Sequence, residues 1–323
     1  MDAIKKHKGP AILAMNHPNA FIDPIAITWD LFPVRTHYMA RGDAFKPGLI
    51  TFLLNQIGII PIYRLRDGGK EGLLKNDDSY VAVNKLLAKN AKVIVYAEGL
   101  CIQERRLRPL KKGVARMVFG SFEAIKRDDL VVFPVGLNYS QPDKLRSDIF
   151  YNVGEPIRVA DYLEDYKENQ TKTYNKFLKH LTTEMKKLVT HIDDPINDKL
   201  VVNLETMFTY SYIKWNKQLD NLENRFNFTL RLTKTINKAQ KNNPELTEDL
   251  RLKTAGYFKQ LRVHNLRDWI IDPARKSLSK IYLLFFSLVM IVLLPFHVFG
   301  LIGNIAPYKL TEYLTKKAVK KNK

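Results

Sequence analysis

The chain has 323 residues, of which 46% are hydrophobic and 11% aromatic, so it can bury a sizeable core and is not disordered as a whole. Lys and Arg outnumber Asp and Glu by 52 to 33, and the resulting net charge of +19 indicates an anionic partner: nucleic acid, a lipid surface or a phosphorylated substrate. The single cysteine, Cys101, excludes an intramolecular disulfide and fits a cytosolic environment.

The first 160 residues alternate short apolar runs with stretches of helical periodicity, and no signal peptide is visible at the start of the sequence. We expect strands at residues 11–15, 58–63, 92–96 and 130–135, and helices at residues 24–31, 80–89 and 113–125. Strands that alternate with helices predict an α/β domain over residues 1–160, with a largely parallel sheet flanked by helices.

The strand signals stop near residue 160, and a helical extension is expected over residues 161–270. Apolar side chains recur three and four residues apart over 174–192, with lysines between them, as in an amphipathic helix. The same pattern continues over 199–240 and 246–262, with a break near Pro244.

Residues 271–323 are expected to form a membrane-associated segment and a basic tail. Residues 281–303 are almost wholly apolar, and this run exceeds the roughly 20 residues that cross a bilayer core. Pro295, Gly300 and Gly303 interrupt the run, and basic residues flank it on both sides. A single crossing and a hairpin that enters and returns therefore both remain open.

The first segment with possible chemistry is residues 16–23, between the first strand and the first helix. His17 at a strand end, with the carboxylate of Asp23 a few residues on, has the parts of a general base and its orienting partner. Alternatively, Asp23 caps the helix that Pro24 begins, and His17 only packs against it. Taken alone, the helix cap is the more common arrangement.

A second segment starts with Glu98-Gly99, after the strand at residues 92–96. Residues 104–116 then hold six basic side chains, Arg105 and Arg106 among them, against one acidic side chain. Such a loop, leading into a helix, predicts either phosphate binding or contact with anionic lipid. Two weaker signals are Arg64 at the end of the strand at residues 58–63, and a proline at residue 134 inside an apolar strand.

Taken together and in this order, the four blocks resemble the glycerolipid acyltransferase family, the lysophosphatidate and glycerol-3-phosphate acyltransferases. Residues 16–23 are similar to the family's His-to-Asp motif, and residues 58–64 to its block ending in Arg. Glu98-Gly99 is similar to the Pro-Glu-Gly block, and residues 132–134 to the apolar block with Pro. The resemblance covers residues 10–160.

Two departures from the family pattern bear on the substrate more than on the reaction type. Five residues separate His17 from Asp23 where four are common, and the extra residue must be absorbed in the Pro18-Asn19 turn if the pair is to touch. The Asp23-Pro24 ending looks like the branch with dual specificity for glycerol 3-phosphate and dihydroxyacetone phosphate. Ala97 stands where proline is usual.

The resemblance implies a reaction and a role for each block. His17 would take the proton of a glycerol hydroxyl, and Asp23 would hold His17. Arg64, Glu98, Gly99, Arg105 and Arg106 are the residues expected to form the acceptor phosphate site. Acyl-CoA or acyl carrier protein would be the co-substrate, with no other cofactor and no metal, and membrane lipids and a glycerol phosphate acceptor would be the partners.

The setting implied is phospholipid biosynthesis at a membrane, with the catalytic domain on its cytosolic face. The acceptor could be glycerol 3-phosphate, 1-acylglycerol 3-phosphate or another hydroxylated lipid. Relatives commonly carry more sequence before the first strand, so we expect the start of the chain to be shortened.

Rival functions explain less of the sequence. A non-catalytic lipid-binding or membrane-tethering protein accounts for the charge and the apolar segment, but not for the His, Glu and Arg at strand ends. No nucleic-acid-binding motif is evident, so nucleic acid is not an expected partner. A metal-dependent hydrolase is disfavoured, because the His and acidic residues lack clustered ligand spacing.

Overall fold

The computed structural model describes residues 1–45, 48–63, 76–141, 147–272 and 280–321, and it divides the chain into two compact units. The first unit is Met1–His264 and the second is Asn265–Lys323. The expected division at residues 160 and 270 stays a prediction.

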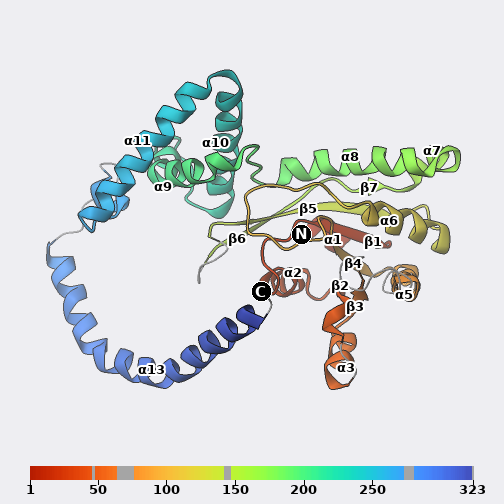
Figure 1. Ribbon diagram of the computed structural model, residues 1–323, viewed down its shortest axis with the longest axis horizontal. Coiled ribbons are helices and arrows are strands. Elements are labelled where there is room, and N and C mark those ends of the chain that lie inside the picture. The colour runs from red at the N-terminus through yellow and green to blue at the C-terminus, as the bar shows by residue number, and fades with distance from the viewer. Residues whose placement is uncertain (46–47, 64–75, 142–146, 273–279, 322–323) are drawn as a thin grey trace. The chain divides into compact units, whose positions relative to one another are not determined.

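A mixed, largely parallel sheet forms the centre of the first unit (Figure 1). Its strands are β1 (Ala11–Met15), β2 (Thr36–Arg41), β3 (Ile59–Ile62), β4 (Lys92–Tyr96), β5 (Val131–Tyr139), β6 (Ile149–Val153) and β7 (Ile157–Arg158). Their spatial order is β3-β2-β4-β1-β5-β6, and β7 also pairs with β5. The first five strands run parallel, whereas β6 and β7 pair with β5 in antiparallel fashion. The predicted fold class is confirmed.

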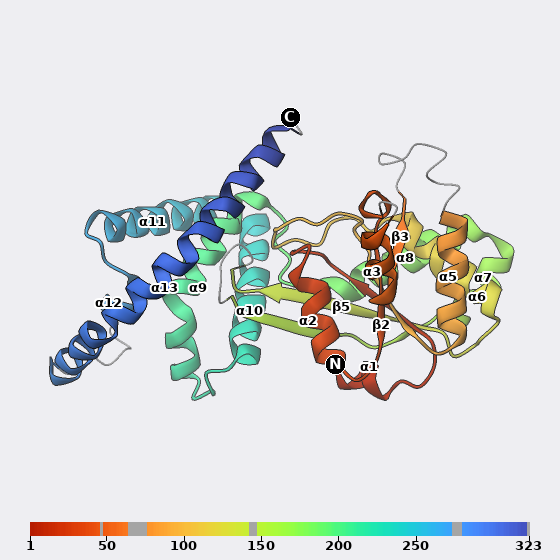
Figure 2. The ribbon, with the colours of Figure 1, turned by 90° about the horizontal axis from the view of Figure 1, so that it is seen from below.

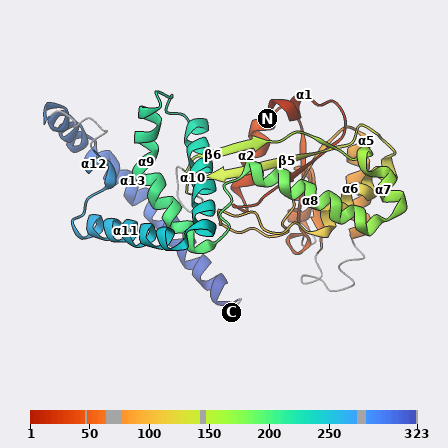
Figure 3. The same ribbon diagram turned by 90° about the horizontal axis from the view of Figure 1, so that it is seen from above.

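Helices cover both faces of this sheet. They are α1 (Asp2–Lys6), α2 (Ile22–Leu31), α3 (Leu49–Gln56), α5 (Asn76–Ala88), α6 (Lys112–Ile125), α7 (Leu163–Glu168) and α8 (Gln170–Leu188). Residues of α5, α6 and α8 share one buried cluster with Ile12 and Ala14 of β1, and Figure 3 shows α8 and α6 on that side. Residues of α1 and α2 pack with Leu13 and Met15 on the other side, which Figure 2 faces. The alternation along β1 follows from the two-residue period of a strand.

Three helices complete the first unit: α9 (Asp198–Trp215), α10 (Leu222–Asn242) and α11 (Pro244–Val263). They pack on one another around Leu200, Leu204 and Ile236. A stacked ring pair, Phe150 with Phe226 at 4.9 Å between centroids, joins β6 to α10. The helical extension is therefore anchored on the antiparallel edge of the sheet.

The second unit consists of α12 (Asp268–Ile271) and α13 (Lys280–Lys321). Ile281–Lys317 is long and apolar enough to cross a membrane, and its side chains are exposed in the structure. The helix bends but continues through Pro295 and Pro307 (Figure 1), so the structure shows one helix where a hairpin would need a turn.

Some local expectations were wrong. The first helix begins at Ile22 rather than at Pro24. Asn19 stabilises the turn before it, because its side-chain oxygen accepts from the backbone N–H groups of Phe21 and Ile22, and its carbonyl oxygen from that of Asp23. Asp23 is thus inside the helix and is not its cap. The helix expected over residues 199–240 is two helices, separated by a turn in which Lys217 has φ +52°.

Candidate active site

The register of the sheet brings the ends of β1 and β4 together beside β5. Met15 of β1 lies beside Tyr96 of β4 on one side and Val135 of β5 on the other. The chain leaves β1 into Asn16-His17 and leaves β4 into Ala97-Glu98-Gly99, at the same edge. In parallel sheets, ligands bind at the carboxyl ends of the strands, and this site lies there.

His17 and Asp23 are in direct contact. His17 Nδ1 lies 2.8 Å from Asp23 Oδ2, within hydrogen-bond distance. The extra residue between them is absorbed in the turn before α2, where Asn19 N also donates to Asp23 Oδ2 at 2.9 Å. The five-residue spacing is therefore compatible with a His–Asp pair.

Tyr139, at the end of β5, completes the shell of donors around Asp23. Its hydroxyl donates to Asp23 Oδ1 at 2.5 Å, so both oxygens of this fully buried carboxylate are satisfied. Burial and the hydrogen bond to Asp23 raise the pKa of the Tyr139 phenol, so the hydroxyl stays protonated and donating. A buried ionised carboxylate needs such partners, because desolvation penalises an unpaired charge.

The His17 imidazole also stacks on the ring of Tyr96. It stacks on Tyr96 with 3.6 Å between centroids and an interplanar angle of 14°, and its side chain is only 14% exposed. With Nδ1 engaged by Asp23, the ring has one remaining nitrogen, Nε2, with which to exchange a proton.

The carboxylate of Glu98 accepts hydrogen bonds from the backbone of two loops. Its Oε2 accepts from the backbone N–H of Arg108 at 3.0 Å, and the backbone N–H of His17 also donates to this carboxylate. Burial raises the pKa of Glu98, and these two amides partly offset that effect. Glu98 therefore connects the His17 turn to the basic loop through backbone groups.

The residues on either side of Glu98 shape the same turn. Ala97 N donates to Met15 O at 2.9 Å, a hydrogen bond that the proline usual in the family could not make. Gly99 has φ +65°, and a Cβ there would lie 3.1 Å from Lys111 Cγ, so a side chain would be strained as well as crowded. Both effects favour glycine at position 99.

A cavity of about 460 Å³ opens beside this site, within the first unit. Its walls come from the His17 turn, the end of β5, the basic loop and α9, and include Asn16, Tyr139, Arg105, Arg106 and Lys199. Tyr139 both lines this cavity and contacts Asp23, so cavity and His–Asp pair are adjacent.

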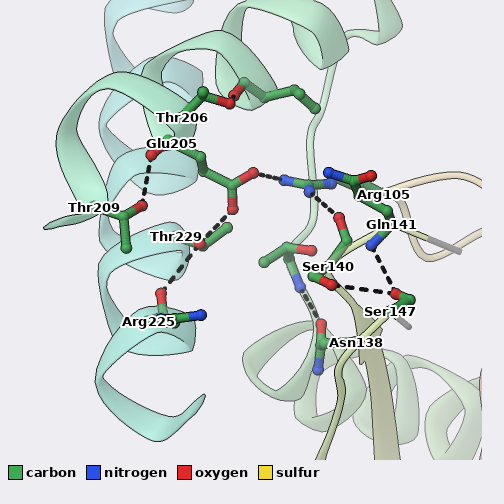
Figure 4. Close-up of polar contacts among 12 residues, drawn as sticks. Arg105, Asn138, Ser140, Gln141, Ser147, Glu205, Thr206, Thr209, Arg225 and Thr229 are labelled. Carbon is green, nitrogen blue, oxygen red and sulfur yellow. Dashed lines mark hydrogen bonds and ion pairs between the residues drawn. The ribbon is translucent and has the colours of Figure 1, made fainter. Parts of the chain in front are cut away.

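The two predicted arginines line this cavity, but each already has an acidic partner. Arg105 forms an ion pair with Glu205 of α9 and donates from Nη2 to Ser140 O at 3.2 Å (Figure 4). Glu205 also accepts a hydrogen bond from Thr229 of α10. Arg106 Nη2 donates to Glu104 at 2.9 Å. The third predicted cation, Arg64, lies outside the described residues.

Cys101 is near the site but is not suited to act as a nucleophile. Burial, with the charges of Asp23 and Glu98, raises the pKa of its thiol to about 11. The reactive thiolate is therefore scarce at neutral pH.

Sequence reasoning missed several residues that the structure brings to this site. Tyr139 lies beyond the strand expected at residues 130–135, and Tyr96 was read only as the end of a strand. Asn16 joins β1 to β5, because its amide donates to Leu137 O at 3.0 Å and accepts from Leu137 N at 2.7 Å. The signal available in the sequence was a polar side chain at the end of an apolar strand: Asn16 directly follows β1, and Tyr139 is the last residue of β5.

Comparison with known proteins finds acyltransferases among the similar sequences. Glycerol-3-phosphate O-acyltransferase 1 of Saccharomyces cerevisiae is 26% identical over 253 residues, which are 75% of this chain and 33% of that protein. Glycerol-3-phosphate O-acyltransferase 2 of the same yeast is 33% identical over 113 residues, 35% of this chain and 15% of that protein. An uncharacterised acyltransferase of Schizosaccharomyces pombe is 32% identical over 94 residues, 28% of this chain and 14% of that protein.

The chain thus spans a third or less of the length of these curated relatives. Residues 2–138 match the acyltransferase family, and this range contains β1 to β4, most of β5 and the His17–Asp23 pair. Through this α/β part, the chain is similar to the acyltransferase family.

Proposed function

We propose that the protein transfers a fatty acyl group from acyl-CoA or acyl carrier protein to a hydroxyl of a glycerol phosphate. The observation that carries this proposal is the hydrogen-bonded His17–Asp23 pair, with its buried carboxylate, beside a cavity of about 460 Å³. The match of residues 2–138 to the acyltransferase family supports the reaction type. The names of the two yeast relatives favour glycerol 3-phosphate as acceptor, ahead of 1-acylglycerol 3-phosphate or another hydroxylated lipid.

In the proposed reaction, His17 Nε2 takes the proton of the acceptor hydroxyl while Asp23 holds Nδ1. The alkoxide oxygen attacks the thioester carbonyl carbon, an ester bond forms, and the carbon–sulfur bond breaks. The leaving thiolate takes the proton back from His17. No covalent enzyme intermediate is required, in agreement with the raised pKa of the Cys101 thiol.

The walls of the cavity supply the proposed acceptor site. Arg105, Arg106 and Lys199 line it together with the acidic Glu104 and Asp198, and the three cations outnumber the two carboxylates as a phosphate monoester requires. Glu98 and Gly99 act on this site indirectly, by shaping the turn between His17 and the basic loop. The assignment of Arg64 to the same phosphate stays a proposal from the sequence.

A membrane setting is part of the proposal. Ile281–Lys317 anchors the chain, and Lys280, directly before this span, favours the cytosolic side for the catalytic part that precedes it. Protease protection of the full chain in sealed vesicles tests this orientation. In sealed vesicles with the cytosolic face outward, protection of the residues before α13 from added protease would contradict it.

The activity is tested by incubating purified full chain with labelled acyl-CoA and a panel of acceptors that includes glycerol 3-phosphate and 1-acylglycerol 3-phosphate. We expect His17→Ala to lower kcat by roughly two to four orders of magnitude, as for loss of a general base, while vesicle binding is retained. His264→Ala, an exposed histidine after α11, is the matched control. Unchanged transfer by His17→Ala would refute the mechanism, and vesicle binding without any transfer by the native chain would favour the lipid-tethering alternative.

A further inference from the structure

Helix α2, which carries Asp23, is apolar on two opposite faces. Its inner face places Ile27 and Leu31 in the core beneath the sheet. Its outer face carries a second apolar row at spacings of three and four residues, and these side chains are at least 65% exposed: Phe21, Ile25, Trp29 and Phe32. A helix that is apolar all round is usually buried on all sides. The outer row of α2 therefore lacks a cover within the part of the chain that the structure describes.

Helix α3 extends this apolar face. It contains no charged residue. Three of its side chains, and that of Ile57 directly after it, are more than half exposed: Leu49, Phe52, Leu53 and Ile57. Figures 1 and 2 show α2 and α3 on the same side of the sheet. Arg35, just after α2, donates from Nη2 to Gln56 O at the end of α3 at 3.3 Å, so the two segments touch there.

We call the eight exposed side chains of these two helices the α2–α3 surface: Phe21, Ile25, Trp29, Phe32, Leu49, Phe52, Leu53 and Ile57. An exposed apolar surface of this kind on a folded unit marks an interaction site. None of its members is acidic, and the exposed Arg35 lies at its edge.

We propose that the α2–α3 surface docks on a lipid bilayer, as a membrane contact of the catalytic unit in addition to α13. Three observations favour lipid over a second protein. The same chain carries a helix long enough to cross a bilayer. The net charge of +19 and Arg35 favour an anionic headgroup layer. A Trp beside Phe and Ile side chains is the composition of a membrane interface.

The docking has a consequence for the reaction, and this step rests on the proposed function. The apolar row begins at Phe21, two residues before Asp23, and the His17–Asp23 hydrogen bond lies at this end of α2. A bilayer in contact with the row therefore lies next to the reaction centre. A long-chain acyl donor then reaches His17 while its chain stays in lipid, and a water-soluble short-chain donor gains nothing from the contact.

The docking is tested on the full chain in phosphatidylcholine–phosphatidylglycerol vesicles. Trp215→Phe and Trp269→Phe leave Trp29 as the sole tryptophan. We expect lipids brominated in the upper acyl chain to quench its fluorescence, and vesicles to abolish its quenching by iodide. The matched control keeps only Trp215, which is exposed on α9 outside the α2–α3 surface and should stay open to iodide and insensitive to bromolipid.

Two outcomes would overturn the proposal. If iodide still quenches the fluorescence of Trp29 in the presence of vesicles, Trp29 has no lipid contact. If vesicles shield Trp29 from iodide but brominated lipid does not quench its fluorescence, Trp29 is covered by a second copy of the chain or by another protein segment. Neither readout requires acyl transfer, so this proposal and the proposed function fail independently.

A kinetic arm tests the consequence for the reaction. Trp29→Glu should raise KM for a long-chain acyl donor in vesicles by about tenfold, as expected when roughly 1.4 kcal/mol of apolar contact is lost. The kcat and KM with a water-soluble short-chain donor should stay unchanged, and Trp215→Glu should change neither. Equal losses with both donors would mean that the substitution disturbs α2 itself.

Discussion

Tyr139 is the residue whose role the structure defines most sharply. Its hydroxyl donates to Asp23 Oδ1, while His17 and the backbone of Asn19 share Oδ2. Tyr139→Phe removes this one hydroxyl and keeps the ring. The carboxylate of Asp23 then has an unsatisfied oxygen in a fully buried position, and can turn away from the geometry that holds His17.

The size of the effect follows from the charge on the acceptor. A hydrogen bond to an ionised group stabilises by about 1.5–3 kcal/mol, and a loss of that size in the transition state slows a reaction about ten- to a hundredfold. We expect kcat to fall within this range and KM for the acceptor to change little, because Tyr139 acts through Asp23. The raised pKa of the phenol means that the hydroxyl donates throughout the assay range, so the deficit should persist up to pH 9.

The assay is steady-state acyl transfer across pH, beside urea unfolding of the same proteins. Tyr151→Phe is a matched control, since this half-buried phenol on β6 makes no hydrogen bond to Asp23 in the described part of the chain. An unfolding cycle with Asp23→Asn should show that the two substitutions are not additive. Full additivity, or a kcat for Tyr139→Phe equal to that of the native chain, would refute the reasoning.

Three further predictions follow from contacts around the site. Glu205→Gln should lower the free energy of unfolding by about 1–3 kcal/mol in urea, because it leaves the partly buried Arg105 without its anion. Gly99→Ala should cost about 1–2 kcal/mol and reduce transfer, since alanine is strained at φ +65°; an unchanged unfolding midpoint would contradict this. Burial and Lys186 lower the pKa of His191, so below about pH 6.5 the unfolded chain binds a proton that the folded chain does not, and stability falls as pH falls. His191→Asn, which keeps an acceptor for Leu107 N, should flatten that acid slope in thermal unfolding curves.

The strands and helices that periodicity predicts best are those buried on the sheet. Residues 11–15 and 92–96 match β1 and β4 to the residue, because a run of apolar side chains between polar ends is a strong signal for a buried parallel strand. Strand β2 escaped prediction because it opens with Thr36 and His37, which are buried and polar. Helix α3 escaped because most of it is exposed although its sequence is apolar.

The candidate site was predictable in its parts but not in its connections. The position of His17 at a strand end follows from the sequence, and its proximity to Glu98 follows from a parallel sheet. The contact of Tyr139 with Asp23 joins residues 116 positions apart, and that of Arg105 with Glu205 joins residues 100 positions apart. No local pattern encodes such pairs, because they depend on how the antiparallel edge and the helical extension fold back on the site.

These long-range pairs change how the basic loop is understood. From the sequence, Arg105 and Arg106 were expected to bind the phosphate of the acceptor. In the structure, each forms an ion pair with a carboxylate. A guanidinium has five N–H donors, and an ion pair through one edge fixes its plane while donors on the other edge remain. Glu205 and Glu104 therefore orient the two arginines at the cavity wall, and a bound phosphate does not have to order two flexible side chains. Because Glu205 belongs to α9, the helical extension takes part in the proposed acceptor site, and its stability and the affinity for a glycerol phosphate should change together.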